Sequence, residues 1–230
     1  MKKLENKNLY EGKVDDYFSA ARKEILELTP IFSDRVLEIG CGSGQTLELI
    51  KHRKLCEKTV GIELFEQAAK NARTRVDDVY HLDIEKDELP SDLGQFDLIL
   101  ILDVLEHLVD PWAVLRRIQS IHLKLGGKMI ISLPNARHFT CVMPLLLNGE
   151  FNYQERGILD KTHLRFFTRK SGTRMLREAG LSIEKVKCTS LDKSLNSGKL
   201  NALTLGVFSE FLISQFIYLA SPDQAQGKNR

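Results

Sequence analysis

Strand-like and helix-like segments alternate along most of this chain. Near-continuous apolar runs such as FDLILIL at 96–102 are followed by amphipathic stretches such as the one at 111–123. The strands of a parallel sheet are apolar along nearly their whole length because helices cover both faces of the sheet. The expected strands lie near 34–39, 58–62, 78–82, 96–102, 127–132, 182–188 and 212–220, and the expected helices near 14–28, 44–52, 65–75, 111–123 and 169–179. The sequence therefore predicts an α/β fold with a Rossmann-like, doubly wound, mostly parallel sheet.

Length and charge narrow the class of protein. A chain of 230 residues, 43% of them hydrophobic, can form one α/β domain, which we expect to span 1–230.

The 33 basic and 31 acidic side chains nearly cancel, so charge gives no sign of nucleic acid as a partner. MKKLENKNLYEGK at the start has no apolar h-region, so a cytoplasmic location is expected. The apolar segment 203–220 contains Glu210 and is shorter than the roughly 20 residues of a membrane span, so no integral membrane segment is expected.

The cysteines and histidines give no sign of a metal site. Cys41, Cys56, Cys141 and Cys188 are far apart and form no CxxC pair, so we expect reduced thiols. The six histidines are dispersed and lack paired ligands nearby in the sequence. No metal is therefore expected.

VLEIGCGSGQTLELI, residues 36–50, predicts a strand, a glycine turn and a helix. Gly40, Gly42 and Gly44 give G-x-G-x-G, with Gln45 where a dinucleotide-binding turn places its third glycine. Glycines let a ligand approach the backbone, and the N-terminus of the following helix favours an anionic group. Taken alone, the turn also fits a tight bend without a ligand.

Acidic residues follow the next two expected strands. Glu63 lies at the end of the second strand, 19 residues beyond Gly44, where its carboxylate can accept hydrogen bonds from both hydroxyls of a ribose. Asp83 and Ile84 follow the third strand, where they can meet an exocyclic amine and a ring face. This arrangement favours adenosine held across the first three strands.

Five segments together resemble the class I S-adenosylmethionine-dependent methyltransferases: LEIGCGSG, GIEL, HLDIE, FDLILILDVLEHL and LKLGGKMIISLPN, over roughly residues 30–135. The resemblance implies a seven-stranded sheet whose antiparallel last strand, FLISQFIYLA, is inserted beside the fifth. It implies S-adenosyl-L-methionine as the cofactor, with the acidic residue at 38 orienting the methionine end. The cofactor-binding residues it implies are Glu38, Gly40, Cys41, Gly42, Ser43, Gly44, Glu63, Leu64, Asp83, Ile84, Asp103 and Val104.

Candidate acceptor-side residues come from two segments. LDVLEHL follows the fourth strand, and His107 within it is a candidate general base. The alternative is a structural role, in which His107 only helps to cap the helix that begins at Asp110-Pro111. The apolar residues of 134–167 follow neither a helical nor a strand period, and this segment is expected to form a lid. KTHLRFFT within them resembles the ubiquinone-biosynthesis and surface-glycan methyltransferases, and His163 is the preferred base, although a hydrogen-bonded clasp is an equal alternative. The candidate substrate-binding residues are Asn135, His138, Asp160 and Arg165.

The sequence therefore predicts a methyltransferase for a small-molecule or glycan/lipid acceptor, directed to oxygen. The alternatives are a nicotinamide-dependent oxidoreductase and a non-catalytic adenosine-ligand-binding module. The glycine spacing, Asp83 and the lack of a Tyr-x-x-x-Lys pair disfavour the oxidoreductase. A D/N-P-P-Y/F/W motif is also missing, which disfavours base methylation in DNA. A sugar hydroxyl, a quinone-like phenol and a carboxylate all stay open as acceptors, as does a homodimer.

Overall fold

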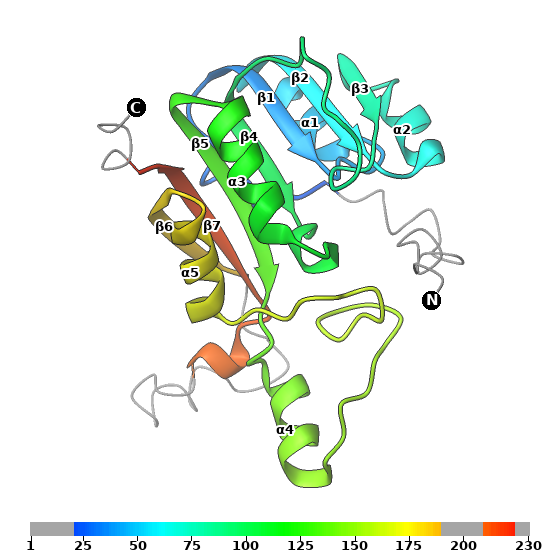
Figure 1. The fold of residues 1–230 in the computed structure, drawn as a ribbon, viewed down its shortest axis with the longest axis vertical. Helices are drawn as coiled ribbons and strands as arrows, with labels where there is room; N and C mark the ends of the chain where they lie inside the picture. Colours follow the sequence, from blue (N-terminus) through cyan, green and yellow to red (C-terminus); the bar gives the residue numbers. More distant parts are fainter. Residues whose placement is uncertain (1–20, 190–208, 224–230) are drawn as a thin grey trace.

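The computed structural model describes residues 21–189 and 209–223, which build one seven-stranded sheet with helices on both faces (Figure 1). The strand order is β3-β2-β1-β4-β5-β7-β6. The strands are β1 (Ser33–Ile39), β2 (Cys56–Glu63), β3 (Asp78–His81), β4 (Phe96–Leu102), β5 (Leu123–Pro134), β6 (Leu181–Cys188) and β7 (Gln215–Pro222). The helices are α1 (Gln45–His52), α2 (Glu66–Ala72), α3 (Pro111–His122), α4 (Phe139–Asn148) and α5 (Arg169–Glu178), with 3-10 turns η3 (Lys23–Ile25), η4 (Leu105–His107) and η5 (Ser209–Leu212).

Strand direction follows the predicted pattern. β1 pairs in parallel with β2 and β4, and the parallel pairing continues to β3 on one side and β5 on the other. β7 is antiparallel to both β5 and β6 and lies between them. The doubly wound sheet with an antiparallel last strand beside the fifth is thus confirmed. Because β1 lies in the middle, the glycine turn after it opens at the switch point of the sheet, where ligands bind in such folds.

The apolar run of β4 is explained by its burial on both faces. Ile99 and Ile101 belong to one buried cluster with residues of α3 and α5, whereas Leu98 and Leu100 belong to a second cluster with residues of α1. All four side chains are 0% exposed. Alternate residues of a strand point to opposite faces, so a strand covered on both sides has no polar face.

Sequence signals for the start of α3 are confirmed. Asp110 precedes Pro111, and its side chain accepts a hydrogen bond from the backbone N–H of Ala113 at 3.0 Å. Proline fits the first helical position because its missing N–H has no partner there in any case. The cap fixes where the chain turns away from η4, which stands at the ligand-binding edge of the sheet.

Two predicted elements differ from the observed ones near the chain ends. Residues 14–20 of the predicted helix 14–28 lie outside the described part, and residues 21–28 form only turns around η3. Ile25 and Leu28 are buried beside α1. Their three-residue spacing, which suggested a long helix, is accounted for by a single turn that packs on the sheet. The strand predicted over 212–220 begins at Gln215, because η5 occupies the residues before it. Residues 1–12 and 224–230 also lie outside the description.

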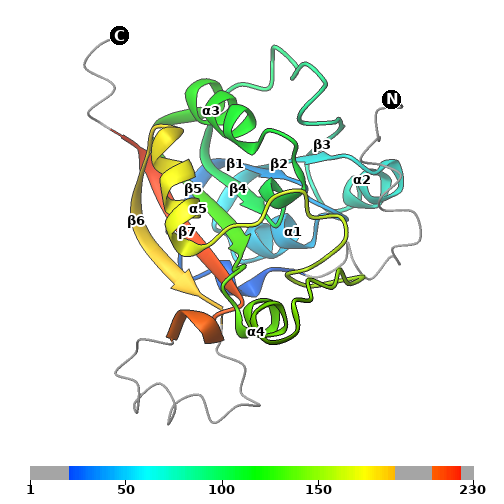
Figure 2. The same ribbon diagram turned by 60° about the horizontal axis from the view of Figure 1, so that its bottom comes forward.

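The predicted lid, 134–167, contains a helix that the sequence did not indicate. α4 is hard to recognise because Leu145, Leu146 and Leu147 are consecutive and because Pro144 lies inside the helix. These leucines are 48%, 72% and 73% exposed, and Cys141 is the one buried residue of α4. Figure 1 shows α4 standing apart from the sheet, and Figure 2 shows the chain after it returning across the ends of the strands. Within the described ranges, none of the helices has the length and apolar character that a bilayer crossing requires.

Candidate active site

A cavity of about 500 Å³ opens at the carboxyl ends of β1, β2 and β4, within the range of about 300 to 1,000 Å³ of ligand pockets. The glycine turn and the ends of these strands form one wall. η4 and residues 157–163 of the lid form the other. The predicted residues that line it are Glu38, Gly40, Cys41, Gly42, Glu63, Leu64, Asp83, Ile84, Asp103, Val104, His107, Asp160 and His163.

The three glycines of the turn have different surroundings. Gly40 and Gly42 line the cavity with φ angles of 72° and 55°, a region that disfavours side chains. A Cβ on Gly40 would lie 2.5 Å from Cγ2 of Val104. Gly44 caps α1 and faces Val76 instead, since its Cβ would lie 2.7 Å from Cγ2 of that residue. Gly44 therefore serves packing, and neither it nor the adjoining Ser43 lines the cavity, so their contact with the cofactor stays a prediction.

Glu63 joins the end of β2 to the glycine turn. Its side chain is 4% exposed; Oε2 accepts a hydrogen bond from the N–H of Gly42 at 2.8 Å, and Oε1 accepts one from Phe65 at 2.9 Å. Burial raises the pKa of this carboxyl, and the backbone hydrogen bonds oppose the shift. A carboxylate offers about four acceptor positions, so the predicted ribose contact is compatible with both bonds.

Glu38 is a second buried acid on the same wall, with 3% exposure. Burial raises its pKa to about 8, while Arg22 lowers it and Glu63 raises it further. Its Oε2 has no hydrogen-bond partner among the described residues. An orphaned buried acceptor of this kind favours a cationic or hydrogen-bond-donating ligand group.

Asp83 and Ile84 lie at the end of the wall that continues from β3. Oδ1 of Asp83 accepts a hydrogen bond from the N–H of Glu85 at 3.0 Å, and Oδ2 pairs with Lys86 at 2.8 Å. Ile84 is 7% exposed and presents an apolar surface beside it. Polar and apolar side chains thus meet where the sequence predicted an adenine ring.

Asp103 lines the cavity and bonds to residues of three segments that are distant in the sequence. It has a φ of 56°, unusual for a residue other than glycine, and it accepts a hydrogen bond from Ser132 Oγ at 2.7 Å. Its carboxylate also pairs with Arg22 and accepts from Gln215. Sequence reasoning found Asp103 but missed Arg22 and Gln215, because neither belongs to a motif and both become neighbours only through the fold.

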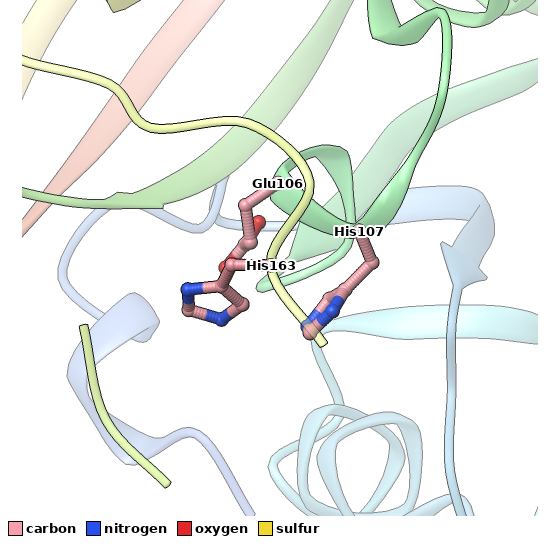
Figure 3. Close-up of side chains that lie close together, drawn as sticks. All are labelled: Glu106, His107 and His163. Carbon is pink, nitrogen blue, oxygen red and sulfur yellow. The ribbon is translucent and has the colours of Figure 1, made fainter. Parts of the chain in front are cut away.

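Glu106, His107 and His163 form a cluster at the lid side of the cavity (Figure 3). One nitrogen or oxygen atom from each lies within 4.8 Å of the others. The two imidazole rings meet edge to face with centroids 4.7 Å apart. The prediction that the histidines are dispersed is therefore wrong for this pair. The fold brings together residues that are 56 positions apart in the sequence.

Glu106 is the most deeply buried member of this cluster, with 1% exposure. Neither of its carboxylate oxygens has a hydrogen-bond partner among the described residues. Burial, with the negative charge of Asp103 nearby, raises its pKa well above the usual range. The resemblance to the methyltransferases placed Glu106 beside His107 at the mouth of the pocket, without a catalytic or binding role of its own.

Backbone hydrogen bonds hold the lid against η4. The carbonyl of Glu106 accepts from the N–H groups of Leu164 at 2.8 Å and Arg165 at 2.9 Å. Asp160 is 1% exposed and its Oδ1 accepts from the N–H and the hydroxyl of Thr162 at 2.9 and 2.7 Å. These contacts fix the turn that carries His163 over the cavity.

Three predicted acceptor contacts lie away from the cavity wall. The buried amide of Asn135 donates to the carbonyls of Glu210 and Ile213, both at 2.7 Å. His138 caps α4, and the guanidinium of Arg165 donates to the carbonyl of Val109. In the structure these side chains are directed to backbone groups or to a helix end by their local turns, and their contact with an acceptor stays a prediction.

Comparison with known proteins identifies the family of this chain. A family described as a methyltransferase domain matches residues 10–186. The chain belongs to the methyltransferase domain family. A curated relative, the ubiquinone biosynthesis O-methyltransferase of Xanthomonas axonopodis pv. citri (strain 306), is 29% identical over 186 residues, which cover 74% of this chain and 72% of the relative.

Solved structures share the fold of this methyltransferase. The S-adenosylmethionine dependent methyltransferase from Mesorhizobium loti has 17% identity and a TM-score of 0.59, covering 90% of this chain and 99% of its own. The O-methyltransferase of a trans-AT PKS multienzyme of Brevibacillus brevis was solved with S-adenosyl-L-homocysteine. It has 17% identity and a TM-score of 0.54, and the match covers 83% of this chain and 67% of its own. With the family match and the cavity, they make this protein an enzyme, a methyltransferase that uses S-adenosyl-L-methionine.

Proposed function

We propose that this methyltransferase transfers a methyl group to an oxygen atom of a small-molecule or glycan/lipid acceptor. One observation carries the proposal: a single cavity has the glycine turn and Glu63 at one end and the His107–His163 pair at the other. The name of the relative, an O-methyltransferase of ubiquinone biosynthesis, supports oxygen as the acceptor atom. A sugar hydroxyl and a phenol both remain within this class.

At the cofactor end, the residues suit the parts of S-adenosyl-L-methionine. Glu38 would hold the ammonium of the methionine moiety, and Gly40 and Gly42 would give this moiety room against the backbone. Glu63 accepts from the ribose hydroxyls. Asp83 and Ile84 meet the adenine amine and ring face. Asp103 and Val104, which line the cavity beside η4, would lie next to the reacting end of the cofactor.

At the acceptor end, the chemistry is an in-line displacement. The acceptor hydroxyl loses its proton, the oxygen forms a bond to the methyl carbon, and the C–S bond breaks with its electron pair going to sulfur. The products are a methyl ether and neutral S-adenosylhomocysteine. His163, with His107 beside it, takes the proton of the acceptor hydroxyl as the general base, a role that imidazole side chains commonly fill.

Calorimetry with purified full-length protein tests the cofactor half of the proposal. We expect binding of S-adenosylmethionine and S-adenosylhomocysteine and none of NAD. Binding of NAD without either sulfur ligand would instead support the nicotinamide oxidoreductase.

Transfer of labelled methyl to fractionated cell extract tests the acceptor half and separates the enzyme from a non-catalytic adenosine-binding module. Mass spectrometry of the labelled species then identifies the acceptor. A labelled methyl ether supports the proposal. A labelled amine, carbon or nucleic acid, or cofactor binding without any labelled product, contradicts it.

The proposal includes a cytoplasmic location, expected from the sequence. Cell fractionation with an antibody to the protein checks the location. A homodimer is the simplest assembly to test, and light scattering of the purified protein distinguishes it from a monomer.

A further inference from the structure

Glu85 is a cavity residue to which the sequence assigned no role. It follows Asp83 and Ile84 in the turn after β3 and lines the cavity with them. Its carboxylate reaches the segment between η4 and α3, where Oε1 accepts a hydrogen bond from the N–H of Asp110 at 2.8 Å and Oε2 accepts one from that of Val109 at 3.1 Å. The turn that would face the adenine ring is thereby tied to the start of α3.

These two bonds fill donors that the start of a helix leaves free. The N–H groups around a helix start have no partner within the helix, and the helix dipole favours a negative charge beside them. In a capping box, a glutamate three positions into the helix accepts from the capping residue. α3 has no acidic residue in its first turn, and Glu85, 25 positions before Asp110, takes that role from outside the helix.

The lid binds the opposite side of the same peptide unit. The carbonyl of Val109 accepts hydrogen bonds from Nε of Arg165, at 3.1 Å, and from Nη2 of the same side chain. This carbonyl and the N–H of Asp110 belong to one planar peptide group and point in opposite directions. A rotation of that plane would therefore break the contact with Glu85 and the contact with the lid together. Both partners are charged groups, which strengthens the two bonds relative to neutral ones.

Arg165 is held in the lid by its own backbone and by α3. Its N–H donates to the carbonyl of Glu106 at 2.9 Å, and its guanidinium carbon lies 5.9 Å from the centroid of the Trp112 ring. The residue that contacts the Val109–Asp110 peptide therefore belongs to the turn that carries His163 over the cavity.

The other end of this path is the wall that would hold the adenine ring. The N–H of Glu85 donates to Oδ1 of Asp83 at 3.0 Å, and the carbonyl of Ile84 accepts from the guanidinium of Arg117. A ligand that contacts Asp83 and Ile84 restricts this turn, and the turn determines where the carboxylate of Glu85 points. The cofactor wall and the lid are thus joined through one carboxylate and one peptide group.

We propose that Glu85 is a positioning residue through which the bound cofactor orders the lid and strengthens binding of the acceptor. When the lid is displaced, the Val109–Asp110 peptide loses Arg165 and turns more freely, so the cofactor wall loses a fixed contact. The cofactor therefore binds better to the closed lid, and a ligand shifts an equilibrium only through such a difference in affinity. This inference rests on the proposed function and adds cooperation between its two substrates, which acts equally in both directions.

Hydrogen exchange of the full-length protein, read by mass spectrometry, tests the inference with S-adenosylhomocysteine alone as the probe. Every variant is saturated with this ligand, as measured by calorimetry, so that occupancy is equal. The variants are Glu85→Ala, Glu85→Gln, which keeps one acceptor oxygen, and Arg165→Met, which removes the guanidinium. Glu88→Ala is the matched control, because Glu88 is an exposed glutamate on the same connection between β3 and β4.

We expect the ligand to slow exchange of the Leu164 and Arg165 amides by about 5-fold or more in the unmodified protein and in Glu88→Ala, the lower end of usual couplings between sites. The slowing should fall below about 2-fold in Glu85→Ala and Arg165→Met and lie between these values in Glu85→Gln. Combining Glu85→Ala with Arg165→Met should remove no more than either change alone, since both act on one peptide unit. Should Glu85→Ala not fold, Glu85→Gln and Arg165→Met carry the same test.

On the acceptor identified by methyl labelling, Glu85→Ala should raise the KM for the acceptor by about 5-fold or more and leave kcat nearly unchanged. A residue that only caps α3 would lower thermal stability but would leave this KM and the slowing of exchange in place. That outcome overturns the inference, as does equal exchange with and without ligand in unmodified protein that binds it, and both leave the proposed function intact. Failure of the unmodified protein to bind S-adenosylhomocysteine would instead overturn the proposed function.

Discussion

At the cofactor end of the cavity, Gly42 lies in the turn after β1 and Glu63 at the end of the neighbouring strand β2, and a hydrogen bond of 2.8 Å joins them. At the acceptor end, His107 and His163 come from a 3-10 turn and from a lid 56 positions further along the chain. The first end is a set of short segments, each directly after a strand. The second exists only because backbone bonds hold the lid on η4.

This difference separates two tasks in one cavity. Strand ends within a sheet are fixed by the whole core, so they suit a constant ligand such as the cofactor. A lid can change its length and composition while the sheet stays the same, which suits an acceptor that differs from one methyltransferase to another. Damage at the first end should affect cofactor affinity, and damage at the second should affect turnover.

The largest expected effect is at the glycine turn. Gly42→Val should abolish binding of S-adenosylhomocysteine, because Gly42 has a φ of 55° and a branched side chain would enter the cavity. Gly126→Val is the matched control, since its φ is 80° and no atom lies within 4 Å of the added Cβ. Calorimetry measures binding and circular dichroism checks the fold. Full affinity in a folded Gly42→Val protein would show that the turn is structural only.

Next in size is the acceptor end. His163→Ala should lower turnover by about 10² to 10⁴-fold, the range for loss of acid–base assistance, with little change in affinity for the cofactor. His107→Ala is measured in parallel on the acceptor identified from extract. If both variants kept full turnover, the cluster would have no part in the reaction. Loss of cofactor affinity in either would remove the contrast between the two ends.

A smaller effect is expected from the acids at the ends of β2 and β3. Glu63→Ala should weaken cofactor binding by about 1.5 to 3 kcal/mol, since it removes hydrogen bonds to a charged group and releases the N–H of Gly42. Asp83→Ala should weaken it by less, about 0.5 to 1.5 kcal/mol, because Asp83 is partly committed to Lys86. A larger effect from Asp83 would reverse this order of importance.

Glu38 should make cofactor binding depend on pH. Burial raises its pKa to about 8, opposed by Arg22 and reinforced by Glu63, so at pH 7 the free protein holds a proton there. The ammonium of the cofactor favours the carboxylate, so binding releases a proton and strengthens as pH rises towards 8, by at most about 10-fold per unit. Calorimetry at pH 7 in two buffers of different ionisation enthalpy counts the protons. The α-amino group of the cofactor also titrates in this range, so Glu38→Gln is the reference. Equal proton release in both proteins would contradict the prediction.

The smallest effect concerns the lid itself. Amides of α4 should exchange with solvent faster than those of Leu164 and Arg165, because Cys141 is the one buried residue of α4 whereas the two amides bond to Glu106. Bound cofactor and acceptor should slow exchange over 157–165 more than in α4. Hydrogen exchange read by mass spectrometry measures both. Uniform exchange across 134–167 would mean that the lid moves as one piece.

Much of the fold was predictable because its signals are local. The burial of FDLILIL on both faces and the Asp110-Pro111 helix start were expected from the residues themselves. The inserted antiparallel β7 was expected from the resemblance to the methyltransferase family. α4 was not, since three consecutive leucines hide a helical period and Pro144 argues against one.

The cofactor end was largely predictable from the sequence and the acceptor end only in part. Residues that follow strands converge by rule in a parallel sheet, so Glu63 and Asp83 could be placed. The contact between His107 and His163 depends on how the lid folds back, and no spacing in the sequence encodes it. Arg22 and Gln215 meet Asp103 for the same reason: three segments without a shared motif become neighbours.

The place of β7 has a consequence for the order in which the protein is built during synthesis. Among the described strands β6 pairs with β7 alone, and Gln215 at the start of β7 reaches Asp103 in the cavity. β7 leaves the ribosome after the six other strands, and it must enter between β5 and β6 before that wall is complete. A nascent chain that already displays the glycine turn therefore still lacks part of its binding site. Capture of the cofactor becomes a late event, one that can pull the final strand into place and act as a check that the whole domain has been made.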